Sequence, residues 1–199
     1  VIPPKNKLDP IRDNEMNEKT PKHGITGGFC IEKNEVVRYL DHIKGKKGVK
    51  GEIYSDKTTK KDEKYRDVMI YRLDQSDIEL YEPIQTIANK VNRYFNYQLD
   101  GIEQAQVMKY QSPSNGYDWH MDLGAEGVSL TRKIGVSVLL NEDYKGGELF
   151  FRGGNSEQSI KPKTGEVVAF SSFVHHKVNP VTKGKRLVLV FWLTGSCFR

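Results

Sequence analysis

Residues 175–192 read HHKVNPVTKGKRLVLVFW, and this stretch constrains the fold more than any other part of the chain. The strand that it predicts over residues 186–194 is almost wholly apolar, as expected of a strand that is buried inside a protein. Arg186 stands at the head of this strand, so we expect a buried guanidinium, which needs an anion. Its planar fork suits a carboxylate, either that of a ligand or that of an acidic residue at the strand end.

The sequence around this strand is β-rich from residue 101 onward, where short segments alternate with glycine-containing turns. Two helices are expected upstream, over residues 32–44 and about 77–97, and Pro83 predicts a kink or a later start in the second. Helices followed by many short strands indicate an α+β protein whose strands form a sandwich or open barrel, with the helices packed outside. Further strands are expected at 68–73, 104–111, 133–141, 148–152 and 166–171.

The length of 199 residues suits one domain with an extension. We expect an N-terminal arm over residues 1–28 and a single domain over 29–199, made of helical support (29–100) and a β-rich core (101–199). No stretch approaches the roughly 18 apolar residues that a membrane span needs. Two distant cysteines cannot make a disulfide framework or a cysteine metal cluster. We therefore expect a chain without membrane association in a reducing compartment, the cytoplasm.

The net charge of +5 is concentrated in one segment. Residues 44–66 hold nine basic and four acidic side chains, so this segment accounts for the whole excess. Its polar, glycine-containing sequence predicts a long mobile loop. Such a loop is either a solvated face or a functional lid, and its charge favours an anionic partner.

Two separate signals indicate a metal site. His120 and Asp122 lie two residues apart, so on an extended segment their side chains project from the same face. A histidine that follows the apolar strand at 166–171, either His175 or His176, is placed to supply a third ligand. Two histidines and one carboxylate are the ligand set of non-haem Fe(II) oxygenases, whereas a His-x-Asp triplet alone is more often a surface pair.

Taken in order, the His-x-Asp triplet, the distal histidine and an arginine ten residues later resemble the Fe(II)- and 2-oxoglutarate-dependent dioxygenases. The chain looks most like their prolyl 4-hydroxylase-like branch, including its compact microbial and viral members. The resemblance covers about residues 102–194. It includes Tyr110, Tyr117 and the segments 139–141, 144–149, 162–165, 176–181 and 184–186.

The resemblance implies a double-stranded β-helix, or jelly roll, with iron at its open mouth. The family pattern His-x-Val-x-Pro-Val selects His176 over His175, which becomes a residue of the rim. Some relatives carry a tyrosine in place of Leu139, and Ser137 is a weaker candidate for the lost contact. The metal ligands implied are His120, Asp122 and His176, and the residues implied to hold or enclose 2-oxoglutarate are Arg186, Tyr110 and Trp192.

The implied activity is the hydroxylation of a C–H bond with Fe(II), 2-oxoglutarate and O2, which releases succinate and CO2, with ascorbate as a further reductant. The prolyl hydroxylase likeness favours a prolyl residue of a peptide or protein. Tyr117 and Trp119 either line its groove or pack within the sheet. Lys57, Lys60 and Lys61 of the basic loop are the candidates for contact with an acidic substrate.

Three alternatives stay open: hydroxylation of another peptidyl side chain, oxidative demethylation of nucleic acid, and a non-catalytic jelly-roll binding module. No base-stacking motif supports nucleic acid. A compact viral member would act in the host cytoplasm.

Overall fold

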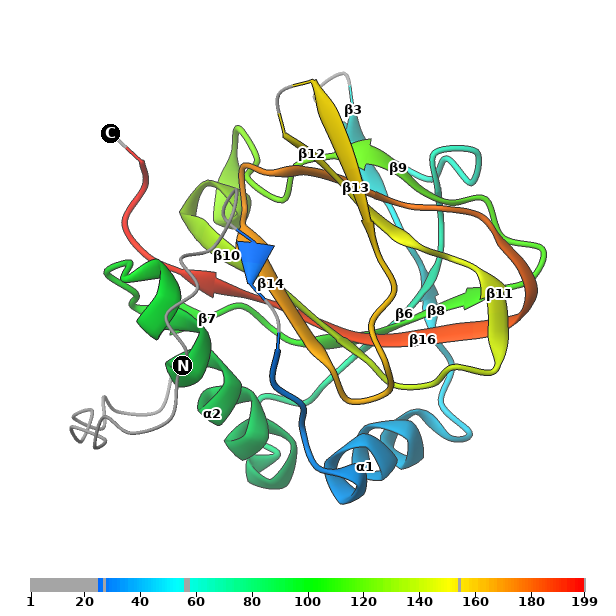
Figure 1. Cartoon of the computed structure of the whole chain (residues 1–199), viewed down its shortest axis with the longest axis horizontal. Helices are drawn as coiled ribbons and strands as arrows, with labels where there is room; N and C mark the ends of the chain where they lie inside the picture. Colours follow the sequence, from blue (N-terminus) through cyan, green and yellow to red (C-terminus); the bar gives the residue numbers. More distant parts are fainter. Residues whose placement is uncertain (1–24, 27, 56–57, 154, 199) are drawn as a thin grey trace.

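The computed structural model describes residues 25–26, 28–55, 58–153 and 155–198. Two antiparallel sheets face each other and two helices lie outside them (Figure 1). This arrangement is the jelly roll that the family resemblance implied, within the α+β class that the order of the elements predicted. No helix in these ranges is long and apolar enough to cross a membrane.

The larger sheet lies between the helices and the smaller sheet. Along its path the order is β1 (Ile25–Thr26), β14 (Val167–Ser171), β10 (Arg132–Leu139), β16 (Val181–Thr194), β8 (Gln106–Gln111), β6 (Met69–Arg72) and β2 (Val49–Lys50). Two short strands, β7 (Gly101–Ile102) and β11 (Tyr144–Gly146), also pair with β16. The apolar strand that contains Arg186 is therefore central, with β10 on one side and β8 on the other.

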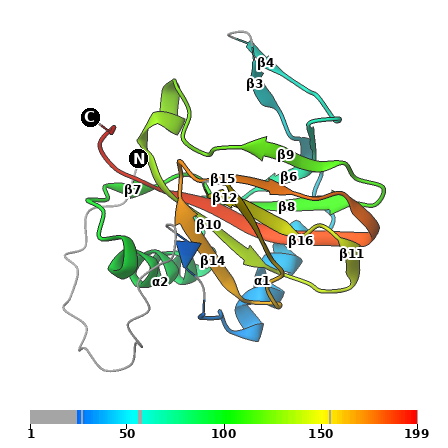
Figure 2. The ribbon, with the colours of Figure 1, turned by 45° about the horizontal axis from the view of Figure 1, so that its top comes forward.

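The smaller sheet covers one face of the larger one. Its order is β13 (Ser156–Ile160), β12 (Leu149–Gly153), β15 (His175–Val178), β9 (Gly116–His120) and β5 (Arg66–Asp67). A separate hairpin of β3 (Ile53–Ser55) and β4 (Thr58–Lys60) projects beyond both sheets (Figure 2). A 3-10 helix, η2 (Gly127–Thr131), precedes β10.

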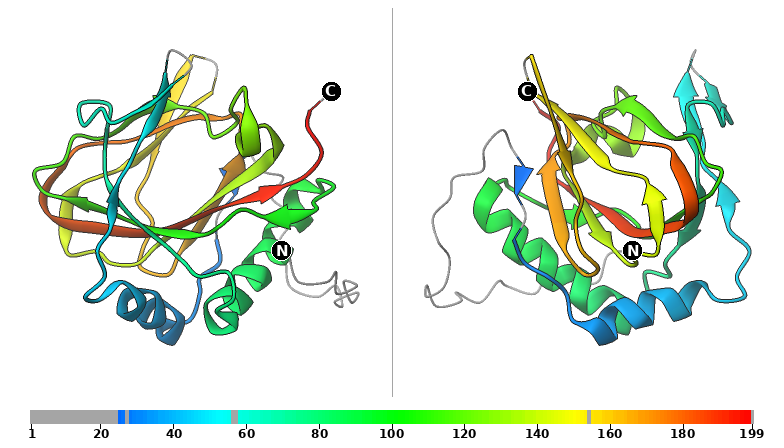
Figure 3. Two further views of the ribbon diagram at one scale, coloured as in Figure 1. Left: turned by 180° about the vertical axis from the view of Figure 1, so that it is seen from behind. Right: turned by 45° about the vertical axis from the view of Figure 1, so that its right-hand side comes forward.

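The helices α1 (Lys33–Ile43) and α2 (Ile78–Phe95) pack against the outer face of the larger sheet (Figure 3). Alternation along each strand divides the apolar residues into two cores. One core joins the helices to the outer face and includes Ile84, Val107 and Leu189. The other lies between the sheets and includes Met108 and Val188. The inner core is adjacent to the site described below.

Pro83 lies inside α2 without delaying its start. A proline there leaves the Glu79 carbonyl without its helical N–H donor. Arg38 of α1 replaces that donor, since its Nη1 lies 2.8 Å from the Glu79 carbonyl oxygen. The neighbouring Tyr39 hydroxyl donates to the Leu80 carbonyl at 2.8 Å. The proline is thus accommodated by contacts between the two helices.

One expectation about the first third of the chain needs correction. The basic segment was expected to be a long mobile loop, but within residues 44–66 the chain forms β2, the hairpin of β3 and β4, and the start of β5. Short strands of this kind depend on their pairing partners, so local pattern does not reveal them. The arm predicted over residues 1–28 lies mostly outside the described residues, and within it Ile25 and Thr26 pair with β14.

Candidate active site

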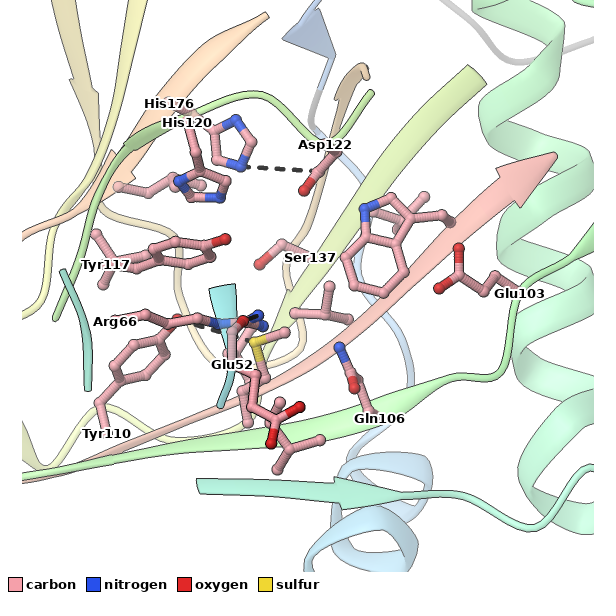
Figure 4. Close-up of a pocket in the computed structure, with 18 of the residues that line it drawn as sticks. Glu52, Arg66, Glu103, Gln106, Tyr110, Tyr117, His120, Asp122, Ser137 and His176 are labelled. Carbon is pink, nitrogen blue, oxygen red and sulfur yellow. Dashed lines mark hydrogen bonds and ion pairs between the residues drawn. The ribbon is translucent and has the colours of Figure 1, made fainter. Parts of the chain in front are cut away.

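The three predicted metal ligands converge at the open end between the sheets. His120 ends β9, Asp122 follows it, and His176 lies on the neighbouring strand β15 directly opposite His120. Their ligand atoms all lie within 4.8 Å of one another, and His176 Nε2 is 3.7 Å from Asp122 Oδ2 (Figure 4). The group can hold a metal ion, with two nitrogens and one oxygen presented together.

Backbone contacts fix the orientation of both imidazoles. His120 Nδ1 lies 2.6 Å from the Asp118 carbonyl oxygen, and His176 Nδ1 lies 2.9 Å from that of Val174. Each Nδ1 therefore carries the proton and donates it, which leaves Nε2 as the metal-binding atom. Burial, followed by the proximity of His176, lowers the pKa of His120 well below its usual value. Its ring is therefore neutral, as metal binding requires.

A glycine makes room for the carboxylate ligand. A Cβ atom at Gly135 of β10 would lie 2.6 Å from Asp122 Oδ2 and 2.9 Å from Cε2 of Phe170. The site therefore excludes every larger residue at this position while the carboxylate keeps its place. Arg132 steadies the same ligand from another side, because its Nη1 donates to the Asp122 carbonyl at 3.2 Å.

His175 lies outside the cluster. It is exposed, whereas His176 is buried, because consecutive residues of a strand face opposite sides of the sheet. Its register partner on β12 is Arg152, whereas that of His176 is Phe151 of the inner core. The choice of His176 that the family pattern indicated therefore agrees with the geometry.

Arg186 lies in the same cavity, which has a volume of about 520 Å³. The guanidinium is almost fully buried, its Nε has no hydrogen-bond partner, and no carboxylate of the described residues lies within ion-pair distance of it. Gly147 gives it room, since a Cβ there would lie 2.9 Å from Arg186 Cδ. The alternative of an internal salt bridge is therefore not found, and the charge is available to a ligand.

Three further side chains enclose the cavity beside Arg186. Tyr110 is its register partner on β8, and burial raises the pKa of the Tyr110 hydroxyl, which therefore stays protonated and can donate. Trp192 and Ser137 also line the cavity, whereas Leu139 does not. Ser137 points into the space between Tyr117 and Asp122 in Figure 4. It thus faces the pocket, one of the two alternatives that the sequence left open.

The predicted substrate residues fall into different environments. Tyr117 lines the cavity and its ring stacks on that of His120, with centroids 3.5 Å apart. Trp119 does not line the cavity. Instead, Arg152 and Lys177 lie over its ring at 4.2 and 4.9 Å, which is the alternative of packing within the sheet. A register shift between β9 and β15 brings both Tyr117 and His120 inward and leaves Trp119 outside.

The three predicted lysines are only partly described. Lys61 is exposed and lines the cavity. Lys60 ends β4, and its side chain lies outside the described part of the chain, as does the whole of Lys57. Other described residues of the basic segment also line the cavity, among them Val49 and Lys50 of β2.

Sequence reasoning missed several residues of the cavity. Arg132 binds Glu103 through two contacts of 2.6 Å and lies 3.8 Å above the Trp192 ring. Arg66 of β5 lies over the Tyr117 ring at 4.6 Å. Nothing in the sequence distinguishes either arginine from the other basic residues. Their role depends on pairing between strands that are remote along the chain.

Comparison with known proteins agrees with this geometry. Residues 105–194 match the 2OG-Fe(II) oxygenase superfamily. A PKHD-type hydroxylase of Idiomarina loihiensis is 30% identical over 139 residues, covering 67% of this chain and 55% of that protein. A Pseudomonas putida prolyl-4-hydroxylase has a TM-score of 0.69 at 18% identity, covering 87% of this chain and 94% of that one.

A further solved structure is a prolyl hydroxylase in complex with a hypoxia inducible factor oxygen degradation domain peptide fragment from Trichoplax adhaerens. It has a TM-score of 0.69 at 19% identity and covers 86% of this chain and 84% of that one. At such identities the structural likeness supports the fold. Against the first curated relatives, all PKHD-type hydroxylases, the chain spans between 37% and 42% of their length.

The fold is a jelly roll, and its cluster of two histidines and a carboxylate has the donor set of non-haem iron proteins. The matched segment contains the candidate metal ligands, Arg186, Tyr110 and Trp192. These matches support the 2OG-Fe(II) oxygenase superfamily for this chain, and its fold has the prolyl 4-hydroxylase-like architecture that the sequence resemblance predicted.

Proposed function

We propose that the protein is an Fe(II)- and 2-oxoglutarate-dependent dioxygenase that hydroxylates a prolyl residue of a peptide or protein. The observation that carries the proposal is the meeting of two features in one cavity. A cluster of two histidines and one carboxylate lies at its mouth, and a buried arginine whose Nε has no hydrogen-bond partner among the described residues lies in its wall. The first suits Fe(II) and the second suits the far carboxylate of a dicarboxylic cosubstrate.

His120 and His176 would hold Fe(II) through Nε2, and Asp122 would hold it through its carboxylate. The donor set fits this ion, because imidazole and carboxylate are the ligands of non-haem Fe(II) sites that keep open positions. The backbone carbonyls behind both rings accept from Nδ1, so each ring presents Nε2 to the ion. Gly135 supports this fit by leaving the carboxylate unobstructed.

Arg186 would bind the C5 carboxylate of 2-oxoglutarate, with Tyr110 donating a second hydrogen bond from the adjacent strand. Both side chains are buried and lie on paired strands, so their separation is fixed before the ligand arrives. Trp192 and Val188 also line the cavity, and their apolar surfaces would help to exclude water from it.

The bound metal and cosubstrate, with O2, supply the oxidising chemistry that inserts oxygen into an unactivated C–H bond and releases succinate and CO2. The residues of the chain bind and orient. They place one C–H bond of the substrate beside the metal and keep the pocket dry. No described side chain is needed as a nucleophile or general base. Ascorbate would act only as an external reductant that returns the metal to Fe(II).

A peptidyl proline is supported by two structural neighbours. One is a prolyl-4-hydroxylase of Pseudomonas putida, and the other is a prolyl hydroxylase that was solved with a peptide bound. The open end of the cavity also suits an extended chain. Lys50 and Lys61 of the basic segment line it, so an acidic peptide would be attracted to the mouth.

The test is a turnover assay on a library of peptides that each contain one proline. Incubation with Fe(II), 2-oxoglutarate and O2 should add about 16 Da to a subset of peptides and form an equal amount of succinate. His176→Ala should abolish both products, whereas Arg152→Gln, outside the cavity, should keep them. Succinate that forms only with lysine peptides or with methylated DNA would reassign the substrate, and a chain that binds Fe(II) without forming succinate would refute the enzyme.

A further inference from the structure

The cavity holds more unsatisfied hydrogen-bond donors than the proposed function uses. In the described ranges, three buried side-chain nitrogens lack a hydrogen-bond partner: Arg66 Nε, Arg186 Nε and Trp192 Nε1. All three residues line this cavity, and all three atoms are donors. Arg186 is assigned above to the cosubstrate. Arg66 lies on the opposite sheet and has no role so far.

Arg66 is held firmly by its surroundings. Its Nη1 donates to the Glu52 backbone carbonyl at 2.6 Å, and its guanidinium lies 4.6 Å from the centre of the Tyr117 ring (Figure 4). Gly51 lies directly against the side chain, since a Cβ there would lie 3.0 Å from Arg66 Nε. An arginine that is fixed in this way loses little conformational entropy when it binds a ligand.

The construction repeats that of Arg186. Each arginine is the register partner of a tyrosine on the next strand: Arg186 of Tyr110, and Arg66 of Tyr117. The guanidinium lies over that tyrosine ring, at 5.5 Å for Arg186 and 4.6 Å for Arg66. A glycine makes room for each side chain, and each has a buried, unpartnered Nε. The two pairs belong to opposing sheets on either side of one cavity.

The charge of Arg66 is not neutralised within the described residues. Its neighbour Asp67 pairs with Lys50 at 3.4 Å, and Glu103 pairs with Arg132. Glu52 offers only its backbone carbonyl to Arg66. A half-buried cation without a carboxylate partner is a site for an external anion, and the exposed Lys61 adds charge of the same sign to the cavity lining.

We infer that Arg66, seated on Tyr117, is a second carboxylate-binding subsite, which takes an acidic group of the substrate close to the metal. The inference rests on the proposed function, because Arg186 must be occupied by the cosubstrate for Arg66 to select the substrate. Two sources have the required chemistry: an aspartate or glutamate side chain of a peptide, or its C-terminal carboxylate. Arg66 is thus a specificity-determining residue, and the preferred peptide is acidic.

Peptide selection by the full chain tests this assignment. The chain is saturated with 2-oxoglutarate and Mn(II), which the same ligands accept. The probes are two hexapeptide libraries with one fixed proline, one amidated and one with a free C-terminal carboxylate. Retained peptides are identified by mass spectrometry for the wild type, Arg66→Gln and Arg66→Lys, with Arg152→Gln as a control of equal charge change outside the cavity.

The wild type and Arg152→Gln should enrich acidic peptides about tenfold over Arg66→Gln, the effect of losing one charge-assisted hydrogen-bond partner. Arg66→Lys keeps the charge but loses the planar guanidinium, so its enrichment of acidic peptides should lie between that of the wild type and that of Arg66→Gln. If Arg66→Gln does not fold, Arg66→Lys replaces it in the comparison. Enrichment within the amidated library assigns a side-chain carboxylate, and enrichment of free C-termini assigns the other source. If the wild-type chain recovers acidic and neutral peptides equally, or retains no acidic peptide, the inference is overturned.

Mn(II) and 2-oxoglutarate are quantified in the same samples. A chain that binds both Mn(II) and 2-oxoglutarate but does not select acidic peptides refutes the Arg66 subsite alone. A chain that does not bind Mn(II) and 2-oxoglutarate refutes the proposed function.

Discussion

Substitution of Gly135 by alanine should weaken metal binding while leaving the fold intact. The new Cβ would lie 2.6 Å from Asp122 Oδ2, so the carboxylate has to retreat by about 0.8 Å to reach ordinary contact at 3.4 Å. Metal–ligand distances tolerate only about 0.2 Å. Asp122 therefore cannot keep its bond in the original position, and Phe170, 2.9 Å from the same Cβ, limits other adjustments.

Disturbances of the residues that support metal ligands typically cost 10- to 100-fold in affinity, so we expect the Kd for Mn(II) or anaerobic Fe(II) to rise by about that factor. This corresponds to about 1.4–2.7 kcal/mol of binding free energy. The assay is equilibrium dialysis with metal analysis, together with thermal unfolding of the metal-free chain.

Val138→Ala is the matched control. Val138 lies on the same strand but in the core that faces the helices. Its truncation should lower the Tm through the cavity that it leaves, with the metal Kd unchanged. An unchanged Kd for Gly135→Ala in a chain with the wild-type Tm would refute the placement of the metal beside Asp122.

Arg186→Gln should weaken 2-oxoglutarate binding about 100-fold by calorimetry, because a charged fork is lost, and an unaltered affinity would reject its role. His176→Ala should abolish metal binding in dialysis, whereas the exposed His175→Ala should not, and the reverse result would exchange the two ligands. Burial raises the pKa of Tyr39, so the native state keeps its proton when the unfolded chain loses it. The free energy of unfolding should therefore fall above pH 10, by up to about 1.4 kcal/mol per pH unit for this group. Tyr39→Phe should make that fall shallower in denaturant titrations, and an identical slope would contradict the explanation.

The metal cluster could be predicted from the sequence because its signal is local. His120 and Asp122 are two residues apart, and the alternation of a strand is enough to align them. Arg186 was recognisable because it interrupts an apolar strand, where an unpaired charge is costly. These cues need no knowledge of the partners across the sheets. The choice between His175 and His176, by contrast, depended on the family pattern.

The missed features depend on which strands become neighbours. Tyr117 and Trp119 were treated together as neighbouring aromatic residues, but the register shift between β9 and β15 places them on opposite faces of the sheet. Arg66 lies in a segment rich in lysine, where composition indicated a loop that is either a solvated face or a functional lid. Its position over Tyr117 follows from the pairing of β5 with β9, which cannot be predicted from the local sequence.

The contact between Arg38 and the Glu79 carbonyl makes the two helices unsuitable for separate exchange. A chimera that takes α2 from a relative without Pro83 restores the helical donor and makes Arg38 redundant, whereas a foreign α1 without Arg38 removes the side-chain donor and leaves the Glu79 carbonyl to water. In chimeras of this jelly roll, α1 and α2 should therefore be exchanged together. The same reasoning predicts that residues 38 and 83 vary together among relatives that share this helix pair.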